Sequence, residues 1–248
     1  MLREETVFGP IASRRLGSSL GINLLPTKGK ICNFDCIYCE CGWNADGRGD
    51  TTLPSAAAVH DSLLRKLENL HEKVDSITFS GDGEPTLNPD FAAIVSDTLA
   101  LRDCFLPGAR VSVLSNATRA NVPEVFEALR KVDSPIMKID APTTALAQKI
   151  NRPAPHYDVD AVVRSLEAFG GDFILQTMFL RSPFFDSSSP EVLLPWMDIV
   201  RHLRPRHVMA YTIDRATPMA QLQKFSPEQM QAMLQPLLDE GFQVSIFG

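Results

Sequence analysis

Apolar residues along this chain follow two alternating patterns. In one stretch, Ala56, Val59, Leu63, Leu67 and Leu70 recur at intervals of three and four, which predicts an amphipathic helix. Elsewhere, apolar and β-branched residues stand in short runs of the length typical of strands. These runs predict seven strands, at Leu20–Leu25, Ser76–Ser80, Val111–Ser115, Ile136–Asp140, Phe173–Phe179, His207–Ile213 and Phe242–Phe247.

Three short motifs mark helix starts. Each has a capping side chain, then a proline, then an acidic residue: Asn88-Pro89-Asp90, Ser189-Pro190-Glu191 and Ser226-Pro227-Glu228. The missing N–H of proline costs nothing in the first turn of a helix, and an acid there suits the helix dipole. We therefore expect a helix to begin at each motif.

The alternation of strands and helices continues to the C-terminus. Nearly continuous apolar strands favour a parallel sheet buried on both faces. Six or seven strands are too few for a closed eight-unit barrel. A doubly wound sheet would favour a Gly-x-Gly-x-x-Gly turn after the first strand, and the sequence has none there. The predicted fold class is α/β, a partial, open (β/α)6 TIM-type barrel with parallel strands. With no repeat or linker visible, we expect one domain over 1–248, made of an N-terminal segment and first strand (1–30), a cysteine loop (31–42) and the remaining β/α units (43–248).

Composition and charge exclude several classes of protein. The 248 residues are 44% hydrophobic and 22% charged, which is typical of a globular chain. With 24 basic and 30 acidic residues the net charge is −6, which disfavours bulk binding of nucleic acid. No apolar run approaches the roughly 18 residues of a membrane span, and Met1–Glu5 show no start of a secretory signal. We therefore expect a cytoplasmic protein with reduced thiols and no membrane partner.

The cysteines carry the strongest chemical signal. Four of the five, Cys32, Cys36, Cys39 and Cys41, lie close together, and Cys104 stands alone. Thiolates suit zinc or iron–sulfur centres, and three thiols at the spacing of the first three can converge only if a loop wraps around the centre. A zinc knuckle formed by all four is one interpretation, although structural zinc commonly uses two separated pairs. Three ligands on a four-iron cube would instead leave one iron open, with Cys41 and Cys104 as small core residues.

The motif Cys-x-x-x-Cys-x-x-Cys, with Tyr38 before its last cysteine, resembles the signature of the radical S-adenosylmethionine superfamily. The resemblance extends to Ser80-Gly81-Asp82-Gly83-Glu84-Pro85, where that superfamily carries a Gly-Gly-Glu-Pro turn, although Asp82 here separates the glycines. Ser115 and Asn116 end the third predicted strand, and Lys138 and Asp140 end the fourth, where family members contact the cofactor.

This resemblance implies a chemistry and a set of site residues. Cys32, Cys36 and Cys39 would bind a 4Fe–4S cluster whose open iron chelates S-adenosylmethionine. Transfer of one electron to the sulfonium would give a 5′-deoxyadenosyl radical that abstracts hydrogen from a substrate. No residue is assigned to the hydrogen transfer itself. The residues expected to contact S-adenosylmethionine are Tyr38, Gly81, Asp82, Gly83, Glu84, Ser115, Asn116, Lys138, Asp140, Gln176 and Tyr211.

The residues expected to contact the cofactor in the cysteine loop and after the second and third predicted strands suit it chemically, but each also has a plainer interpretation. Carbonyls and a carboxylate of Gly81–Glu84 would suit the cofactor ammonium, or the segment is only a tight turn before a helix. Ser115 and Asn116 would bind ribose hydroxyls, or cap a turn. Tyr38 would lie against adenine, or be a packing anchor.

Residues of the fourth and fifth predicted strands also have both a cofactor-binding and a structural interpretation. Lys138 would neutralise the cofactor carboxylate, or form an ion pair with Asp140. Gln176 stands in the middle of a strand and requires a hydrogen-bond partner.

The N-terminal segments Phe8–Gly17 and Gly21–Pro26 are similar to small proteins grouped with the tRNA wyosine-base synthases. Those synthases use a lysine Schiff base and a second cluster. Here Lys28 or Lys30 would be the candidate lysine, but cysteines for a second cluster are missing.

Other functions are considered beside radical S-adenosylmethionine chemistry on an unidentified substrate. The alternatives are wyosine-type tRNA base modification, a glycyl-radical-enzyme activating enzyme acting on a partner protein, and a structural zinc protein. The expected partners are a small-molecule or macromolecular substrate and a reductant such as flavodoxin or ferredoxin.

Overall fold

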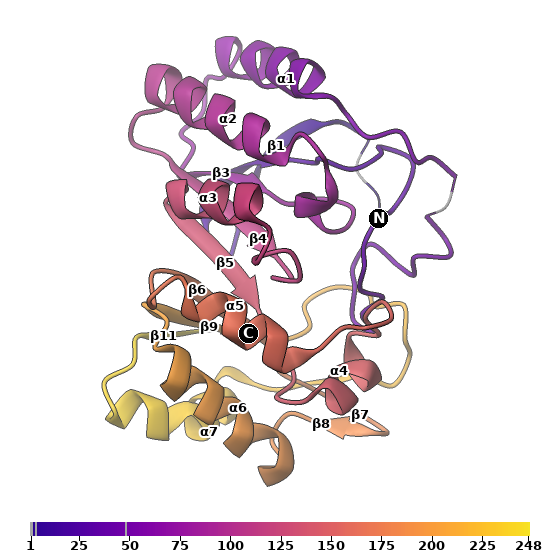
Figure 1. Ribbon diagram of the computed structural model, residues 1–248, viewed down its shortest axis with the longest axis vertical. Coiled ribbons are helices and arrows are strands. Elements are labelled where there is room, and N and C mark those ends of the chain that lie inside the picture. Colours follow the sequence, from indigo (N-terminus) through magenta and orange to yellow (C-terminus); the bar gives the residue numbers. More distant parts are fainter. Residues whose placement is uncertain (1, 3, 48) are drawn as a thin grey trace. The chain divides into compact units, whose positions relative to one another are not determined.

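The computed structural model describes residues 2, 4–47 and 49–248 (Figure 1). Of the segment Met1–Glu5 used above, Met1 and Arg3 lie outside the described residues. The chain forms two compact units, each built from several segments. Unit 1 contains Met1–Asn33, Asn44–Ser115 and Arg119–Pro135, and unit 2 contains Phe34–Trp43, Asn116–Thr118 and Ile136–Gly248. The assignment of 1–248 to one domain stays a prediction.

The strands of unit 1 are ordered β1-β2-β3-β4. They are β1 (Val7–Ser13), β2 (Gly17–Ile22), β3 (Ser76–Phe79) and β4 (Arg110–Ser115). The ladders β2–β3 and β3–β4 are parallel and align Leu20 with Ile77 and Ile77 with Val111, three fully buried side chains. The prediction of parallel strands throughout was wrong at β1, which forms an antiparallel hairpin with β2. The pattern missed β1 because half-buried and exposed positions follow its first two residues.

In unit 1 the predicted amphipathic helix is present, and a second helix begins later than predicted. The predicted amphipathic helix is α1 (Ala56–Glu68), which buries Val59, Leu63 and Leu67; the others are η1 (Pro85–Leu87), α2 (Phe91–Phe105) and α3 (Pro123–Lys131). Helix α2 begins later than the motif at Asn88 predicted, with Asp90 as its N-cap. The reason is that Asn88 forms its own turn, accepting from the Asp90 N–H and donating to the carbonyls of Leu24 and Pro54.

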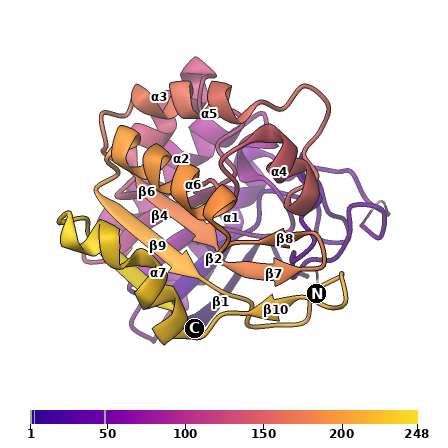
Figure 2. The ribbon, with the colours of Figure 1, turned by 90° about the horizontal axis from the view of Figure 1, so that it is seen from below.

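Unit 2 carries the parallel strand order β5-β6-β9-β11. The strands are β5 (Ser134–Lys138), which starts in unit 1, β6 (Ile174–Met178), β9 (His207–Tyr211) and β11 (Val244–Phe247). Unit 2 also contains an antiparallel sheet, whose strands lie side by side in Figure 2. In order across the sheet, they are β10 (Gln223–Lys224), β7 (Leu180–Ser182) and β8 (Phe185–Asp186). These strands of two or three residues are too short to show a periodicity, so the sequence did not reveal them.

The helices of unit 2 are α4 (Thr144–Ile150), α5 (Val159–Glu167), α6 (Pro190–Leu203) and α7 (Pro227–Asp239). The predicted starts of α6 and α7 are confirmed, with Ser189 and Ser226 as N-caps followed by proline. Ser226 completes a capping box with Gln229, whereas Ser189 makes no side-chain capping bond. Among the described helices, none is both long enough and apolar enough to cross a membrane.

Candidate cofactor site

The four clustered cysteines are not joined in disulfides, and they are divided between the units. Cys32 belongs to unit 1, whereas Cys36, Cys39 and Cys41 belong to unit 2, and all four are half-buried. Cys104 is exposed on α2, so its interpretation as a core residue was wrong. Within residues 2, 4–47 and 49–248, no three His, Cys, Asp or Glu side chains group as ligands of a single metal ion.

The cysteine loop is a series of tight turns, as convergent thiols require. The Cys39 N–H donates to the Cys36 carbonyl at 3.1 Å, and the Gly42 N–H donates to the Cys39 carbonyl at 3.0 Å. Gly42 has a φ of +82°, a conformation that favours glycine and closes the second turn. In unit 1 the Asn44 side chain donates to the Cys32 carbonyl at 3.2 Å. Backbone and side-chain bonds thus hold both parts of the loop.

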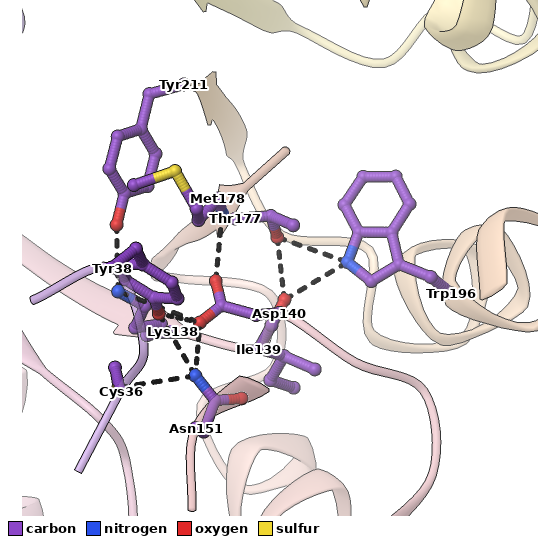
Figure 3. A network of polar contacts seen from close by, with 10 residues as sticks. All are labelled: Cys36, Tyr38, Lys138, Ile139, Asp140, Asn151, Thr177, Met178, Trp196 and Tyr211. Carbon is purple, nitrogen blue, oxygen red and sulfur yellow. Dashed lines mark hydrogen bonds and ion pairs between the residues drawn. The ribbon is translucent and has the colours of Figure 1, made fainter. Parts of the chain in front are cut away.

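Unit 2 contains a buried polar network centred on Asp140 (Figure 3). One carboxylate oxygen accepts from the Tyr38 hydroxyl and, at 2.7 Å, from the amide of Asn151. The other oxygen accepts from the Met178 backbone N–H at 2.8 Å. The Lys138 ammonium lies 3.7 Å from the first oxygen. A carboxylate this deeply buried requires such partners, and here both oxygens have them.

Lys138 is a half-buried cation between two aromatic rings. Its ammonium donates to the Tyr211 hydroxyl at 2.8 Å and lies 4.5 Å from the centre of the Tyr38 ring. Burial opposes the charge, but the Asp140 carboxylate and the Tyr211 hydroxyl outweigh it and raise the pKa of Lys138 above its usual value. Lys138 is therefore charged, and the ion pair with Asp140 that the sequence offered as one interpretation is present.

Two titratable groups of the cysteine loop have pKa values raised by their surroundings. Burial raises the pKa of the Cys36 thiol, against the opposing effect of the Lys138 charge. Burial, followed by the Asp140 charge, raises the pKa of Tyr38 well above its usual value. Tyr38 is thus a neutral phenol that donates to Asp140.

The Gly81–Glu84 segment lies beside the residue that precedes Cys32. The Ile31 N–H donates to the Asp82 carbonyl and the Glu84 N–H donates to the Ile31 carbonyl, both at 3.1 Å, on either side of Gly83. Gly83 has a φ of +138°, and a Cβ there would lie 1.9 Å from the Ile31 carbonyl oxygen. Only glycine permits this approach of two backbones.

The side chains of this segment are buried and hydrogen-bonded. One Glu84 oxygen accepts from the Thr86 N–H, from the Thr86 hydroxyl and, at 2.9 Å, from the Ser115 hydroxyl. Asp82 accepts from the Asn23 amide at 3.3 Å. Unit 1 therefore brings together two predicted site residues, Glu84 and Ser115. Because Glu84 also caps η1, the plainer role of this turn, as the start of a helix, is present as well.

Two further predicted residues of unit 2 differ in their surroundings. The side-chain oxygen Oδ1 of Asn116 accepts from the N–H and the hydroxyl of Thr118, so its turn-capping role is present. Gln176 is 5% exposed, and its amide nitrogen finds no hydrogen-bond partner among the described residues. In the parallel ladder Gln176 is paired with Lys138, which places both side chains on one face of the sheet.

Sequence reasoning missed Asn151, which ends α4 and touches three residues of the network. It also missed Trp196 of α6, whose indole N–H donates to the Ile139 carbonyl and the Thr177 hydroxyl. An asparagine after a helix is an ordinary capping residue, and a tryptophan on an apolar helix face is ordinary core, so neither carries a local signal.

Comparison with known proteins identifies the family. The sequence profile of the Radical SAM superfamily matches residues 27–181, more than half of the chain. The chain belongs to the radical S-adenosylmethionine superfamily, whose members use a 4Fe–4S cluster and S-adenosylmethionine, and these are its cofactors. The matched range contains the cysteine loop and every predicted cofactor-binding residue except Tyr211.

One curated relative and two solved structures are similar to this chain. A UPF0026 protein of Methanocaldococcus jannaschii is 30% identical over 80% of this chain and 60% of its own length. Streptococcus suis SuiB bound to S-adenosylmethionine has a TM-score of 0.65 at 15% identity, over 89% of this chain and 49% of SuiB. The structure of TYW1 with a lysine–pyruvate adduct has a TM-score of 0.65 at 13% identity, over 92% and 76%. These likenesses confirm the fold class, a partial, open TIM-type barrel of β/α units.

The chain is shorter than its curated relatives. It spans between about a third and two thirds of the length of those that match most of it.

Proposed function

We propose that this protein is a radical S-adenosylmethionine enzyme that generates a 5′-deoxyadenosyl radical and uses it to abstract hydrogen from an unidentified substrate. The observation that carries the proposal is the trio Cys32, Cys36 and Cys39, which are not in disulfides and lie on a loop inside the range matched by the superfamily. When bound, the cluster supplies one electron to the sulfonium of S-adenosylmethionine, a chemistry that breaks a carbon–sulfur bond.

The residues that are present fit this pair of cofactors. Three thiolates would hold the cluster and leave one iron for the amino and carboxylate groups of S-adenosylmethionine. The backbone bridge between Gly83 and Ile31 holds the chain in place directly before Cys32. The buried amide nitrogen of Gln176 supplies a hydrogen-bond donor that no described residue uses. An orphaned buried donor favours a ligand acceptor at that place.

We assign the predicted contacts as follows. Gly81, Asp82, Gly83 and Glu84 would face the ammonium group of S-adenosylmethionine, for which carbonyls and a carboxylate are suited.

The remaining contacts would orient the rest of the cofactor. Ser115 and Asn116 would bind the ribose, and Tyr38 would lie against the adenine. Lys138 would neutralise the carboxylate while Asp140 holds Lys138 in place. Gln176 and Tyr211 would donate to polar groups from the same sheet as Lys138.

The proposed setting follows from the chemistry. We propose a cytoplasmic protein with reduced thiols that takes electrons from a flavodoxin or ferredoxin and acts on a small-molecule or macromolecular substrate. A net charge of −6 weighs against tRNA as the substrate.

The test is cleavage of S-adenosylmethionine by protein purified and reconstituted without oxygen. Dithionite-reduced wild-type protein should contain about four irons and four sulfides per chain and should form 5′-deoxyadenosine and methionine. The triple variant Cys32→Ala/Cys36→Ala/Cys39→Ala should lose the iron and the product. Cys104→Ala, which removes an exposed thiol outside the loop, should retain both. If the triple variant still formed 5′-deoxyadenosine, the proposal would be wrong.

A further inference from the structure

The end of α4 is docked on the cysteine loop by backbone hydrogen bonds within unit 2. The Asp35 N–H lies 2.9 Å from the Asn151 carbonyl oxygen, and the Ile37 N–H lies 2.9 Å from that of Ile150. Arg152 extends the contact, since its guanidinium lies 4.7 Å from the centre of the Trp43 ring. Because these bonds flank Cys36 on both sides along the chain, the position of that thiol is fixed by the end of α4.

The Asn151 side chain reaches the thiol itself. It is buried, at 2% exposure, and its amide nitrogen lies 3.4 Å from the Cys36 sulfur, 3.0 Å from the Tyr38 hydroxyl and 2.7 Å from Asp140 (Figure 3). An amide nitrogen carries two protons, so three acceptors compete for two donors. Asp140 also accepts from Tyr38 and from the Met178 N–H. When Cys36 is a thiolate it carries negative charge and becomes a stronger acceptor than the neutral Tyr38 hydroxyl.

We propose that Asn151 is a positioning residue that donates an N–H hydrogen bond to the sulfur of cluster ligand Cys36 and thereby makes the cluster easier to reduce. This inference rests on the proposed function. Reduction adds negative charge that is shared with the ligand sulfurs, and an N–H aimed at a sulfur stabilises that charge. Removing the donor should therefore lower the reduction potential without removing a ligand.

The Asp140 bond keeps the donor in place. Asn151, Asp140 and Lys138 form a chain of contacts from the Cys36 sulfur to the end of β5. The Asp140 carboxylate holds the Asn151 amide, and the Lys138 ammonium lies 3.7 Å from that carboxylate. The Asn151 amide donates directly to the Cys36 sulfur, so its removal should make added negative charge on that sulfur less stable.

The experiment is a redox titration of reconstituted protein without S-adenosylmethionine, followed by electron paramagnetic resonance of the reduced cluster. Asn151→Leu has a similar volume and no donor. At the potential where the wild-type cluster is half reduced, the ratio of reduced to oxidised cluster should fall three- to tenfold, and tenfold corresponds to 59 mV for one electron. Asn151→Gln, which keeps an N–H donor, should recover part of this loss.

A matched control separates the redox effect from a structural one. Asn88→Leu removes another buried asparagine, also 2% exposed, which bonds to Leu24 and Pro54. It should lower stability but leave the cluster potential unchanged. Asn151→Ser, a smaller change, is titrated alongside, so that poor folding of Asn151→Leu does not remove the test.

The outcomes are distinguishable from those of the proposed function. If wild-type protein binds a cluster and the Asn151 variants bind it with an unchanged potential, this inference is overturned and the proposed function stands. If wild-type protein binds no cluster, the proposed function fails and the inference fails with it. A lower potential in Asn151→Leu and in Asn151→Ser, which both lack the amide N–H, with recovery in Asn151→Gln, supports the inference.

Discussion

Replacing Asp140, the carboxylate at the centre of the buried network, by asparagine should strongly destabilise the protein. The substitution keeps the size of the side chain but removes its charge. Lys138, whose side chain is 18% exposed, then lacks the carboxylate that opposes its burial. The Tyr38 hydroxyl and the Asn151 amide, which both donate to one Asp140 oxygen, would meet either a neutral oxygen or a competing N–H.

The expected loss follows from these contacts. Removing one partner of a buried ion pair typically costs about 3–5 kcal/mol, because an uncompensated charge remains. The ammonium–carboxylate distance of 3.7 Å is long, and Lys138 keeps its bond to Tyr211, so we expect the lower end of that range, about 3 kcal/mol.

The assay is urea unfolding of the reduced, cluster-free protein, arranged as a double-mutant cycle. Lys138→Met alone and Lys138→Met/Asp140→Asn complete the cycle. Because the double variant has no unpaired cation, its loss should be smaller than the sum of the two single losses by at least about 1 kcal/mol. Losses that add within about 0.5 kcal/mol, or a loss below about 1 kcal/mol for Asp140→Asn, would refute the reasoning.

Three further predictions concern the frame around the site. Gly83→Ala should cost at least about 3 kcal/mol of unfolding free energy, because the added Cβ would lie 1.9 Å from a backbone oxygen. A Cβ added at Gly108 would have no atom within 4 Å, so Gly108→Ala should change stability little. Equal losses of stability in the two variants would contradict the account. Ser226→Ala should cost about 1 kcal/mol of unfolding free energy in thermal or urea unfolding, because the Ser226 side chain makes a capping bond. Ser189 makes no such bond, so Ser189→Ala should cost clearly less, and a larger loss for Ser189→Ala than for Ser226→Ala would contradict this. Burial, followed by a neighbouring arginine, lowers the pKa of His207 below 6.5. The unfolded chain therefore takes up that proton first, so stability should decline as the pH falls below about 6.5, and His207→Gln should reduce this decline; an unchanged slope would exclude the histidine as its source.

The sequence predicted the parallel part of the fold because its strands have strong local signals. Buried runs such as Ser76–Ser80 and Val111–Ser115 became β3 and β4 with boundaries within one residue. By contrast, β1 (Val7–Ser13) is half-exposed at most of its positions, and its pairing with β2 is a long-range property that no periodicity reports. The start of α2 was misplaced because the Asn88 side chain bonds to distant carbonyls rather than to the helix.

The candidate site was predictable where its chemistry lies in residue type and spacing. The cysteine motif and Gly83 are of this kind, because thiolates and a glycine-only backbone each have few substitutes. Asn151 and Trp196 were not predictable, because their importance comes from tertiary contacts with Cys36 and with Ile139. Cys104 shows the converse, since a lone apolar-looking cysteine on a helix proved to be exposed.

The central claim is that three thiolates hold an iron–sulfur cluster with one iron open to S-adenosylmethionine. The most direct test is the electron paramagnetic resonance spectrum of reduced, reconstituted wild-type protein, recorded with and without S-adenosylmethionine at a temperature where turnover is arrested. The account predicts the signal of a reduced 4Fe–4S cluster whose shape changes when S-adenosylmethionine is added. A protein that carries zinc and no such signal, or a cluster signal that S-adenosylmethionine leaves unchanged, would contradict it.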